Sequence, residues 1–344
     1  MRRLALLACT TAALTAFAAG TAGAKSDAGA SWAAPEIRMV VGAGLMAPTV
    51  AEFRAAEPLT WAEFGTVLAA FGAPDVSVSE PDRLVTLREL DAQLVSLAGL
   101  RPSARRIRLA AAEAGLEPRA WLGTETLARM LGLRINHLRN EEELELQLSE
   151  PATRAEAAYS VARMLTIQDW DLEAVRQAAD SFIFPELTDW QRAVLARSLR
   201  FVGSPYVWAG TSEKLQRLFG KLLPGGFDCS GFVWRVYKLE PFAGAPSLSE
   251  TLKGRTTYAM SGEVARSARV DRAGLQPGDV AFFGLGGPSS KPAEVGHMGI
   301  YVGNGWFVHS SRRGVALEPM TGAWETNFAW GRRPLAEAGL SSSK

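Results

Sequence analysis

Two short alternating runs stand back to back in "EVGHMGIYVGNGWFVHSS", residues 294–311. Each run alternates apolar residues with others, and a Gly-Asn-Gly turn at 303–305 separates them, which is typical of a β-hairpin. A two-residue turn would pair Ile300 with His309, whereas a three-residue loop would pair Gly299 with His309. One residue of slip moves every side chain to the opposite face. The length of the turn therefore decides which residues meet.

The apolar pattern favours the three-residue loop. In that register Val302 pairs with Trp306, and one face carries Met298, Ile300, Val302, Trp306 and Val308. The other face carries His297, Gly299, Tyr301, Phe307, His309 and Ser311. Such a loop favours a left-handed last residue, which Gly305 can supply. We expect both histidines on one face, diagonal across neighbouring strands with Cα atoms about 7–8 Å apart, and open space above Gly299.

A cysteine lies in "PGGFDCSGFVWRVY", residues 224–237, and the chain has only one other, Cys9. The apolar spacing after Cys229 predicts a helix, and Asp228 and Ser230 are residue types that cap helix starts. Cys229 would then lie in the first turn, where the helix dipole lowers the pKa of a thiol. A buried structural cysteine is the alternative, and position alone favours that alternative.

The two histidines of the hairpin favour chemistry at Cys229. A thiolate nucleophile needs an imidazole base, and a third polar group holds that base in one orientation. We assign His297 as the base and His309 as the orienting residue. Two alternatives stay open: the histidines form a polar solvent face, or they bind zinc together with Cys229.

The first 24 residues are predicted to be a secretory signal. Arg2 and Arg3 precede an apolar run that ends in Ala-Gly-Ala at 22–24. An uncleaved anchor is the alternative, although the run is rich in small residues and weakly apolar for a membrane span. Cleavage would remove Cys9 and leave a secreted protein with a single thiol, which has no internal disulfide partner. No later segment is long and apolar enough to cross a bilayer.

Composition sets the broad class of protein. A chain of 344 residues has room for about two domains. Its apolar fraction of 47% and charged fraction of 21% are those of an ordinary soluble protein. The net charge of +1 gives no electrostatic reason to expect a nucleic-acid partner.

The N-terminal half has a helical pattern that repeats. Three residue pairs have the capping-box spacing, each before an amphipathic run: Thr60–Glu63, Thr86–Glu89 and Thr153–Glu156. Residues 105–116 also echo residues 36–45. Repeated helical units bury their apolar faces on each other, so we expect an all-α repeat region.

These repeats resemble S-layer homology repeats, which share a Trp-Ala start, a Gly-Leu pair and a Thr-Arg-Ala-Glu helix opening. Residues 153–156 keep the full motif, whereas Trp61 stands where the arginine would be in the first copy. The resemblance implies attachment to the cell wall through secondary wall polysaccharide. The alternative is a helical packing module that binds no ligand.

Residues 198–334 resemble the NlpC-type family of cell-wall cysteine peptidases, which has a papain-like fold. The matching stretches occur in the family's order: "GSPYVWAG" (203–210), "FDCSGFVWRVY" (227–237), "LQPGDVAFF" (275–283), "VGHMGIYVGNG" (295–305) and "WFVHSS" (306–311).

The resemblance assigns roles to particular residues. It implies Cys229 as nucleophile, His297 as base and His309 as the third member of the catalytic set. It also implies that Tyr206, Asp228 and Ser230 bind the free amino end of a stem peptide. The backbone N–H of Cys229 would be one donor to the oxyanion.

The implied function is that of a secreted, cell-wall cysteine peptidase. It would hydrolyse amide bonds in peptidoglycan stem peptides, typically between D-glutamate and a diamino acid, through an acyl-enzyme and without a metal or organic cofactor. Two alternatives stay open: a thiol amidase acting on another wall bond or on a lipid or amide substrate, and a wall-binding protein without turnover.

The sequence departs from the family between residues 211 and 226. The stretch "TSEKLQRLFGKLLPGG" is longer than the usual link. We expect it to form an extra amphipathic helix beside the cleft entrance, with these residues on its apolar face: Leu215, Leu218, Phe219 and Leu222.

The predicted fold class is α+β: a papain-like cysteine peptidase domain, with an antiparallel sheet packed on helices, preceded by an all-α repeat region. The predicted divisions are a signal at 1–24, a helical region at 30–167, connecting helices at 168–187, the peptidase domain at 188–335 and a polar tail at 336–344.

Overall fold

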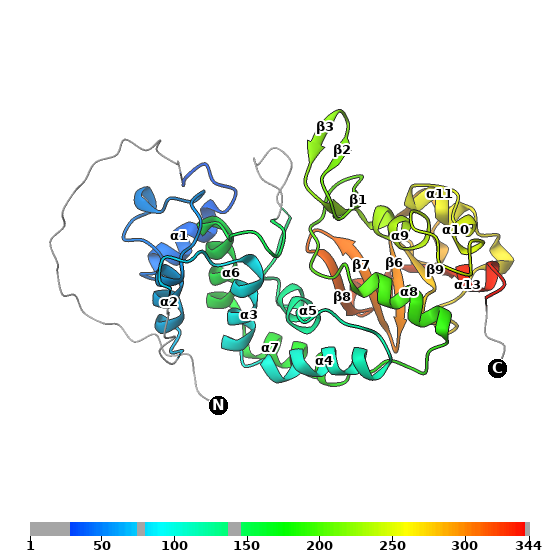
Figure 1. Cartoon of the computed structure of the whole chain (residues 1–344), viewed down its shortest axis with the longest axis horizontal. Helices are drawn as coiled ribbons and strands as arrows, with labels where there is room; N and C mark the ends of the chain where they lie inside the picture. Colours follow the sequence, from blue (N-terminus) through cyan, green and yellow to red (C-terminus); the bar gives the residue numbers. More distant parts are fainter. Residues whose placement is uncertain (1–27, 74–79, 137–145, 341–344) are drawn as a thin grey trace. The chain divides into compact units, whose positions relative to one another are not determined.

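The computed structural model of the chain describes three ranges of residues: 28–73, 80–136 and 146–340 (Figure 1). The predicted signal at 1–24, with Cys9, lies outside the described residues. Among the described helices, none is long and apolar enough to span a bilayer.

The chain divides into two compact units. The first, called here the helical unit, comprises residues up to Ala98 and Ser149–Ile167. The second, called here the sheet unit, comprises Gly99–Leu148 and the chain from Gln168 onward. The domain boundaries predicted from the sequence divide the chain differently, and they stay predictions. The difference arises because the helices of residues 101–130 pack on elements of the sheet unit.

The helical unit is built from α1 (Ala34–Gly42), η1 (Val50–Glu52), α2 (Trp61–Ala70), α3 (Leu87–Leu97) and α6 (Arg154–Thr166). The capping boxes predicted at Thr60 and Thr86 are confirmed, because each threonine accepts from the backbone N–H three residues later and the glutamate there accepts from the threonine N–H. At α6 the side chain of Thr153 accepts the backbone N–H of Glu156. These caps satisfy N–H groups that a helix start leaves without partners.

The three capped segments meet in a ring. Leu59 donates its N–H to the carbonyl of Ala152, Ala152 donates to Val85, and Val85 donates back to Leu59, at N–O distances of 2.8, 2.8 and 2.9 Å. All three residues are fully buried. The sequence repeat therefore has a structural cause: each copy supplies one edge of the ring and one helix.

The side chain of Arg154, from the Thr-Arg-Ala-Glu motif, is buried inside the helical unit and hydrogen-bonded there. Its side chain is only 2% exposed. Its Nε donates to the carbonyl of Phe53 at 2.6 Å, one terminal nitrogen lies 2.6 Å from a Glu63 carboxylate oxygen, and the other donates to the carbonyl of Met46. This arginine stabilises the packing of the unit and is not open to an external ligand.

The sheet unit has a five-stranded antiparallel sheet in the order β8-β7-β6-β5-β9 (Figure 1). Its strands are β5 (Val280–Gly284), β6 (Val295–Gly303), β7 (Trp306–Ser311), β8 (Gly314–Pro319) and β9 (Phe328–Arg332). Its helices of eight residues or more are α4 (Arg101–Glu113), α5 (Leu122–Met130), α7 (Asp169–Asp180), α8 (Asp189–Leu199) and α9 (Cys229–Tyr237). Helix α9 packs on β6 and β7, and α8 packs on α9. The predicted α+β class, with an antiparallel sheet on helices, is confirmed.

Short elements complete the unit. They are α10 (Leu248–Thr251), α11 (Thr257–Gly262), α12 (Ala323–Thr326), α13 (Pro334–Glu337), the 3-10 turns η2 (Arg266–Ala268), η3 (Gly287–Ser289) and η4 (Pro292–Glu294), and the strands β1 (Thr211–Ser212), β2 (Gln216–Leu218), β3 (Lys221–Leu223) and β4 (Gly226–Phe227).

The β6–β7 hairpin has the predicted register with a different turn. Gly299 pairs with His309, as expected, but Gly303 pairs with Trp306 in place of Val302. The turn itself has two residues, 304 and 305, both left-handed with φ of 49° and 80°, as a tight hairpin turn requires. A bulge between Tyr301 and Gly303 takes up the extra residue. The bulge restores the register that brings the histidines to one face.

Residues 211–226 contain a β-hairpin, so the prediction of an amphipathic helix there is wrong. Strand β2 pairs with β3 through a turn at Phe219 and Gly220, whose φ angles are 50° and 77°. Two left-handed residues in succession end any right-handed helix. The apolar side chains expected on one buried face are mostly exposed: Leu215, Phe219 and Leu222. Gln216 holds the base of the hairpin by accepting from Thr211 N–H at 2.9 Å and donating to the carbonyl of Gly226 at 3.0 Å.

We expect Arg154→Ala to destabilise the helical unit by about 2–4 kcal/mol, because the carbonyls of Phe53 and Met46 lose their donor and Glu63 loses one of its two arginine partners. Hydrogen exchange of the α2, α3 and α6 amides under native conditions measures this directly. The control is Arg38→Ala on exposed α1 surface, which should change exchange little. Equal exchange in both variants would show that Arg154 is not structural.

Candidate active site

Cys229 is the first residue of α9, as the sequence predicted. The N-cap is Asp228, whose carboxylate accepts the N–H of Gly231. A Cβ added to Gly231 would lie 1.8 Å from the carbonyl oxygen of Gly210. Glycine is therefore required where the helix start presses against the segment that carries Tyr206, and this close contact sets the position of the thiol.

The pKa of the Cys229 thiol shifts in the direction opposite to the one expected. Burial raises it to about 12, and the negative charge of Asp228 adds to the rise. Backbone N–H groups, among them those of Ser230 and Met298, oppose the shift without reversing it. The favourable end of the helix dipole is thus outweighed by burial and by the capping carboxylate. In the resting protein Cys229 is a neutral thiol, with its sulfur next to the backbone that follows His297.

The two histidines of the hairpin are in direct contact. Nε2 of His297 lies 2.8 Å from Nδ1 of His309. The ring of Phe307 stacks on His309 with centroids 4.3 Å apart, and the ring of Trp324 lies 4.8 Å from both histidine rings. The predicted open space above Gly299 is wrong, since a Cβ there would come within 2.8 Å of His309 and Phe307. Packed rings therefore hold both imidazoles in place.

Sequence reasoning missed Glu318 on β8. Its Oε1 lies 2.5 Å from Nε2 of His309. Strand β8 pairs Ala316 with His309 and Glu318 with Phe307, so Glu318 is diagonal to His309 as His309 is to His297. The signal was present in "GVALEP", residues 314–319, where alternation puts this acid on the histidine face once the β7–β8 register is known.

Burial and the neighbouring groups give His297 and Glu318 different protonation states. Burial, and then the electrostatic interaction with His309, lower the pKa of His297 well below its usual value. Burial alone would raise the pKa of Glu318, but the electrostatic interaction and hydrogen bond with His309, with help from Arg313 and Trp324, bring that pKa below its ordinary value. Glu318 is therefore a carboxylate at neutral pH, whereas His297 is a neutral imidazole.

A cavity of about 460 Å³ opens onto Cys229 and His297. The three residues expected to bind substrate also line it: Tyr206, Asp228 and Ser230. His309 is fully buried and lies behind His297. Five of the six residues singled out from the sequence thus share one cavity, and the sixth supports it through a hydrogen bond.

Arg255 lines this cavity and is a second residue, after Glu318, that sequence reasoning missed. Its guanidinium donates to Ser230 Oγ at 2.7 Å and to the carbonyl of Ala209 at 3.0 Å, and lies 3.4 Å from a carboxylate oxygen of Asp228. Burial raises the pKa of Tyr206 above its usual value, and the negative charge of Asp228 adds to the rise, so this phenol stays protonated. The cavity wall therefore offers a carboxylate, a guanidinium and a phenol donor.

Within the residues that the structure describes, no three histidine, cysteine or carboxylate side chains are grouped in a way that could hold a metal ion. The facing nitrogens of the two histidines are engaged with each other, and the outer nitrogen of His309 is engaged with Glu318.

Comparison with known proteins places the cavity in a recognised domain. The model of the NlpC/P60 family matches residues 203–333. The chain is 28% identical over 145 residues to the murein DD-endopeptidase MepH of Escherichia coli strain K12, covering 41% of this chain and 45% of that protein. It is 34% identical over 139 residues to a gamma-D-glutamyl-L-lysine dipeptidyl-peptidase of Bacillus cereus strain ATCC 10987, covering 39% and 34%. The chain thus spans less than half the length of these curated relatives.

A solved structure gives a further comparison. An NlpC/P60 family protein from Bacillus cereus ATCC 10987 is 28% identical, covers 44% of this chain and 42% of that chain, and has a TM-score of 0.31.

We expect the alkylation of Cys229 by iodoacetamide to rise with pH around a midpoint above the ordinary thiol value of about 8.5. In Asp228→Asn the midpoint should fall, because the variant loses the carboxylate charge while its amide oxygen still caps α9. Mass spectrometry of the peptide that holds Cys229 gives the rates, and Asp82→Asn, on exposed surface, is the control. A wild-type midpoint below 7 would contradict the neutral-thiol state.

Proposed function

We propose that this chain, whose residues 203–333 form a domain of the NlpC/P60 family, is a cysteine-type peptidase that hydrolyses amide bonds in peptidoglycan stem peptides. One observation carries the proposal. The first residue of a helix presents a thiol to a cavity that it shares with an imidazole, and a second buried imidazole holds the first at 2.8 Å. This is the arrangement that nucleophilic acyl transfer requires.

The chemistry follows from the protonation states. As Cys229 Sγ attacks the amide carbon, the neutral His297 takes the thiol proton, so that thiolate forms only in the attack. The tetrahedral oxyanion accepts the backbone N–H of Cys229. His297 then gives its proton to the leaving amine, and the C–N bond breaks to leave a thioester.

Hydrolysis reverses the sequence. Water enters the place of the amine, and His297 takes one of its protons as the water oxygen attacks the thioester. As the C–S bond breaks, His297 returns that proton to the sulfur of Cys229. The products are a carboxylic acid and the free thiol, so the residues return to their starting states. His309 orients His297 throughout.

For the bond that is cut we propose the one between D-glutamate and the diamino acid of a stem peptide. Asp228 and Tyr206 would bind the free amino end, the former with a negative charge and the latter with an oriented phenol, while Ser230 lines the same wall. The name of the Bacillus cereus relative supports this choice. The name of the Escherichia coli relative refers to a DD bond, and cleavage there is the alternative outcome of the assay.

Export of the protein belongs to the same proposal. Peptidoglycan lies outside the cytoplasmic membrane, and the segment at 1–24 has the pattern of a secretory signal. The protein would act in the cell wall after cleavage of that segment.

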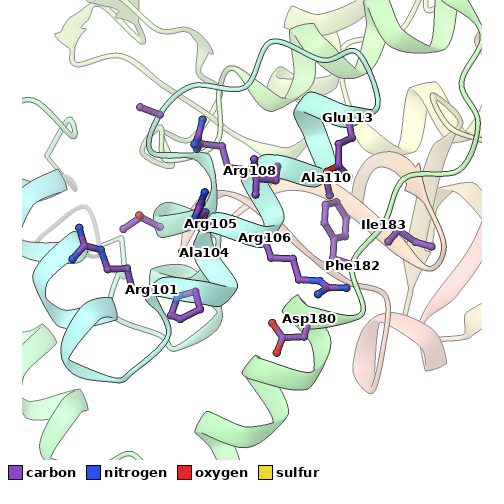
Figure 2. A pocket seen from close by; sticks show the side chains of 14 residues that line it. Arg101, Ala104, Arg105, Arg106, Arg108, Ala110, Glu113, Asp180, Phe182 and Ile183 are labelled. Atoms are coloured by element: carbon purple, nitrogen blue, oxygen red, sulfur yellow. The ribbon is translucent and has the colours of Figure 1, made fainter.

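A second candidate function is wall-polymer binding by the predicted helical region 30–167. An open groove of about 1200 Å³ runs along α4 (Figure 2). Arg101, Arg105 and Arg108 line it at i, i+4 and i+7, a spacing that puts them on one helix face over about 10 Å. No ion pair involves these three among the described residues.

Like charges at this spacing repel each other and destabilise a helix. An anionic polymer in the groove would relieve that repulsion, so charge complementarity supports wall polysaccharide that carries phosphate or carboxylate groups. The site would lie on α4, because Arg154 of the Thr-Arg-Ala-Glu motif is buried.

We expect Cys229→Ala to lower the release of new amine ends from purified peptidoglycan by at least about a thousandfold, because the nucleophile is lost. Mass spectrometry of the fragments gives both the rate and the bond that is cut, with Lys253→Ala as control. If the wild-type protein releases no peptide fragments, the proposed function is wrong. If Cys229→Ala releases them at the wild-type rate, the proposed nucleophile is wrong.

We expect Arg101→Gln/Arg105→Gln/Arg108→Gln to sediment with purified cell walls more weakly than wild type, and with a smaller dependence on salt, because three anion contacts are lost. The matched control removes the same charge elsewhere, with Arg38→Gln/Arg217→Gln/Arg266→Gln on exposed surface. Equal sedimentation of the two triple variants would leave α4 as a packing helix only.

A further inference from the structure

We infer that Glu318 is a positioning residue: through His309 it fixes the tautomer of His297 that can accept the proton of Cys229. The inference deepens the proposed function and rests on it for the role of Cys229. It starts from three side chains on neighbouring strands, β6, β7 and β8, joined by contacts of 2.8 and 2.5 Å.

The first step is at Glu318. Its carboxylate can only accept hydrogen bonds, and its Oε1 lies 2.5 Å from Nε2 of His309. Nε2 of His309 therefore carries a hydrogen. In a neutral imidazole the other nitrogen, Nδ1, is then without one and must accept.

The second step is at His297. Since Nδ1 of His309 accepts, the nitrogen 2.8 Å away, Nε2 of His297, must donate. The hydrogen of neutral His297 is thereby placed on Nε2, and Nδ1 keeps its lone pair. The cavity that His297 shares with Cys229 is where that lone pair is needed.

The opposite arrangement would be inactive. If Nδ1 of His309 donated, Nε2 of His297 would accept, and the hydrogen of His297 would occupy Nδ1. That nitrogen could not take a proton from the thiol. Two neutral imidazoles in contact have no strong preference between these directions, so a fixed acceptor at the far end decides between them.

The surroundings fix Glu318 as that acceptor. His309 is fully buried against the rings of Phe307 and Trp324, which limits its rotation. Cys229 shares the cavity with His297, and the guanidinium of Arg313 lies 3.9 Å from a carboxylate oxygen of Glu318. Arg313 favours the ionised form of Glu318, the form that can only accept.

The carboxylate has a second consequence during reaction. When His297 takes the thiol proton it becomes an imidazolium in a buried site, where an isolated charge is costly. The negative charge of Glu318, one ring away, offsets that cost. Removing it should slow the chemical step more than it weakens substrate binding.

The test uses the full chain with ¹⁵N-labelled histidine and the variants Glu318→Gln and Glu318→Leu. The first keeps an acceptor but loses the charge, and the second removes both. In wild type at neutral pH, long-range proton–nitrogen spectra should show His297 protonated at Nε2 and His309 also at Nε2. In Glu318→Leu the Nδ1 tautomer of His297 should become populated, and kcat on a stem peptide should fall about 10–100-fold with little change in KM. For Glu318→Gln we expect a kcat and a population of the Nδ1 tautomer between those of wild type and Glu318→Leu.

The control is Glu325→Gln, an exposed acid on α12, which should match wild type in tautomer and kcat. His297 protonated at Nδ1 in the wild-type protein would overturn the inference, and so would an unchanged His297 tautomer in Glu318→Leu. The spectra need no substrate. They therefore decide the tautomers even if the protein cleaves no peptidoglycan, and the wild-type spectrum decides them even if a variant does not fold.

Discussion

A hydrogen bond of 2.8 Å between Nε2 of His297 and Nδ1 of His309 is the constraint on which the site depends. It exists only because both residues face the same side of the sheet, and that requires Gly299 to lie opposite His309. The bulge between Tyr301 and Gly303 secures this register while the chain still turns through two left-handed residues. Gly299 is part of the same constraint, because any larger residue would push His309 out of line. The strand register and the turn geometry thus together determine whether the two histidines can meet.

The same burial that holds the rings determines how the site can work. It raises the pKa of Cys229 and lowers that of His297, so the resting site holds a neutral thiol and a neutral imidazole. In the proposed mechanism no thiolate–imidazolium pair exists before attack, and proton transfer from Cys229 to His297 accompanies the attack. The positive charge on His297 would form next to His309, its buried hydrogen-bonded partner, with the Glu318 carboxylate on the far side of His309. Charge would then be stabilised where it develops, as in other preorganised active sites.

Much of this could be predicted from the sequence, and the exceptions have physical reasons. Alternation and turn residues predicted the hairpin, its faces and the pairing of Gly299 with His309, because those are local properties. Glu318 was missed because its role depends on the register of a second hairpin, β7–β8, which the local sequence pattern does not define. The prediction of a helix at 211–226 was wrong because Phe219 adopts a left-handed conformation, which is unusual for a phenylalanine and is not indicated by the sequence. The prediction that the pKa of Cys229 is lowered was wrong, because burial is a property of the folded chain. The position of Cys229 at a helix start could be predicted from the local sequence. The roles of Tyr206, Asp228 and Ser230 stay predictions, although all three line the cavity.

The central claim is that Cys229 becomes acylated by the stem peptide, and trapping the intermediate tests it most directly. The full protein is mixed with a synthetic stem peptide, quenched in acid within the first turnovers and measured by intact mass, followed by digestion to locate the added group. We predict an added mass equal to the acyl half of the peptide, carried by the segment that contains Cys229 and lost on raising the pH. Product formation with the added group on another residue would contradict the claim, and so would turnover of a peptide by protein whose Cys229 has been fully alkylated.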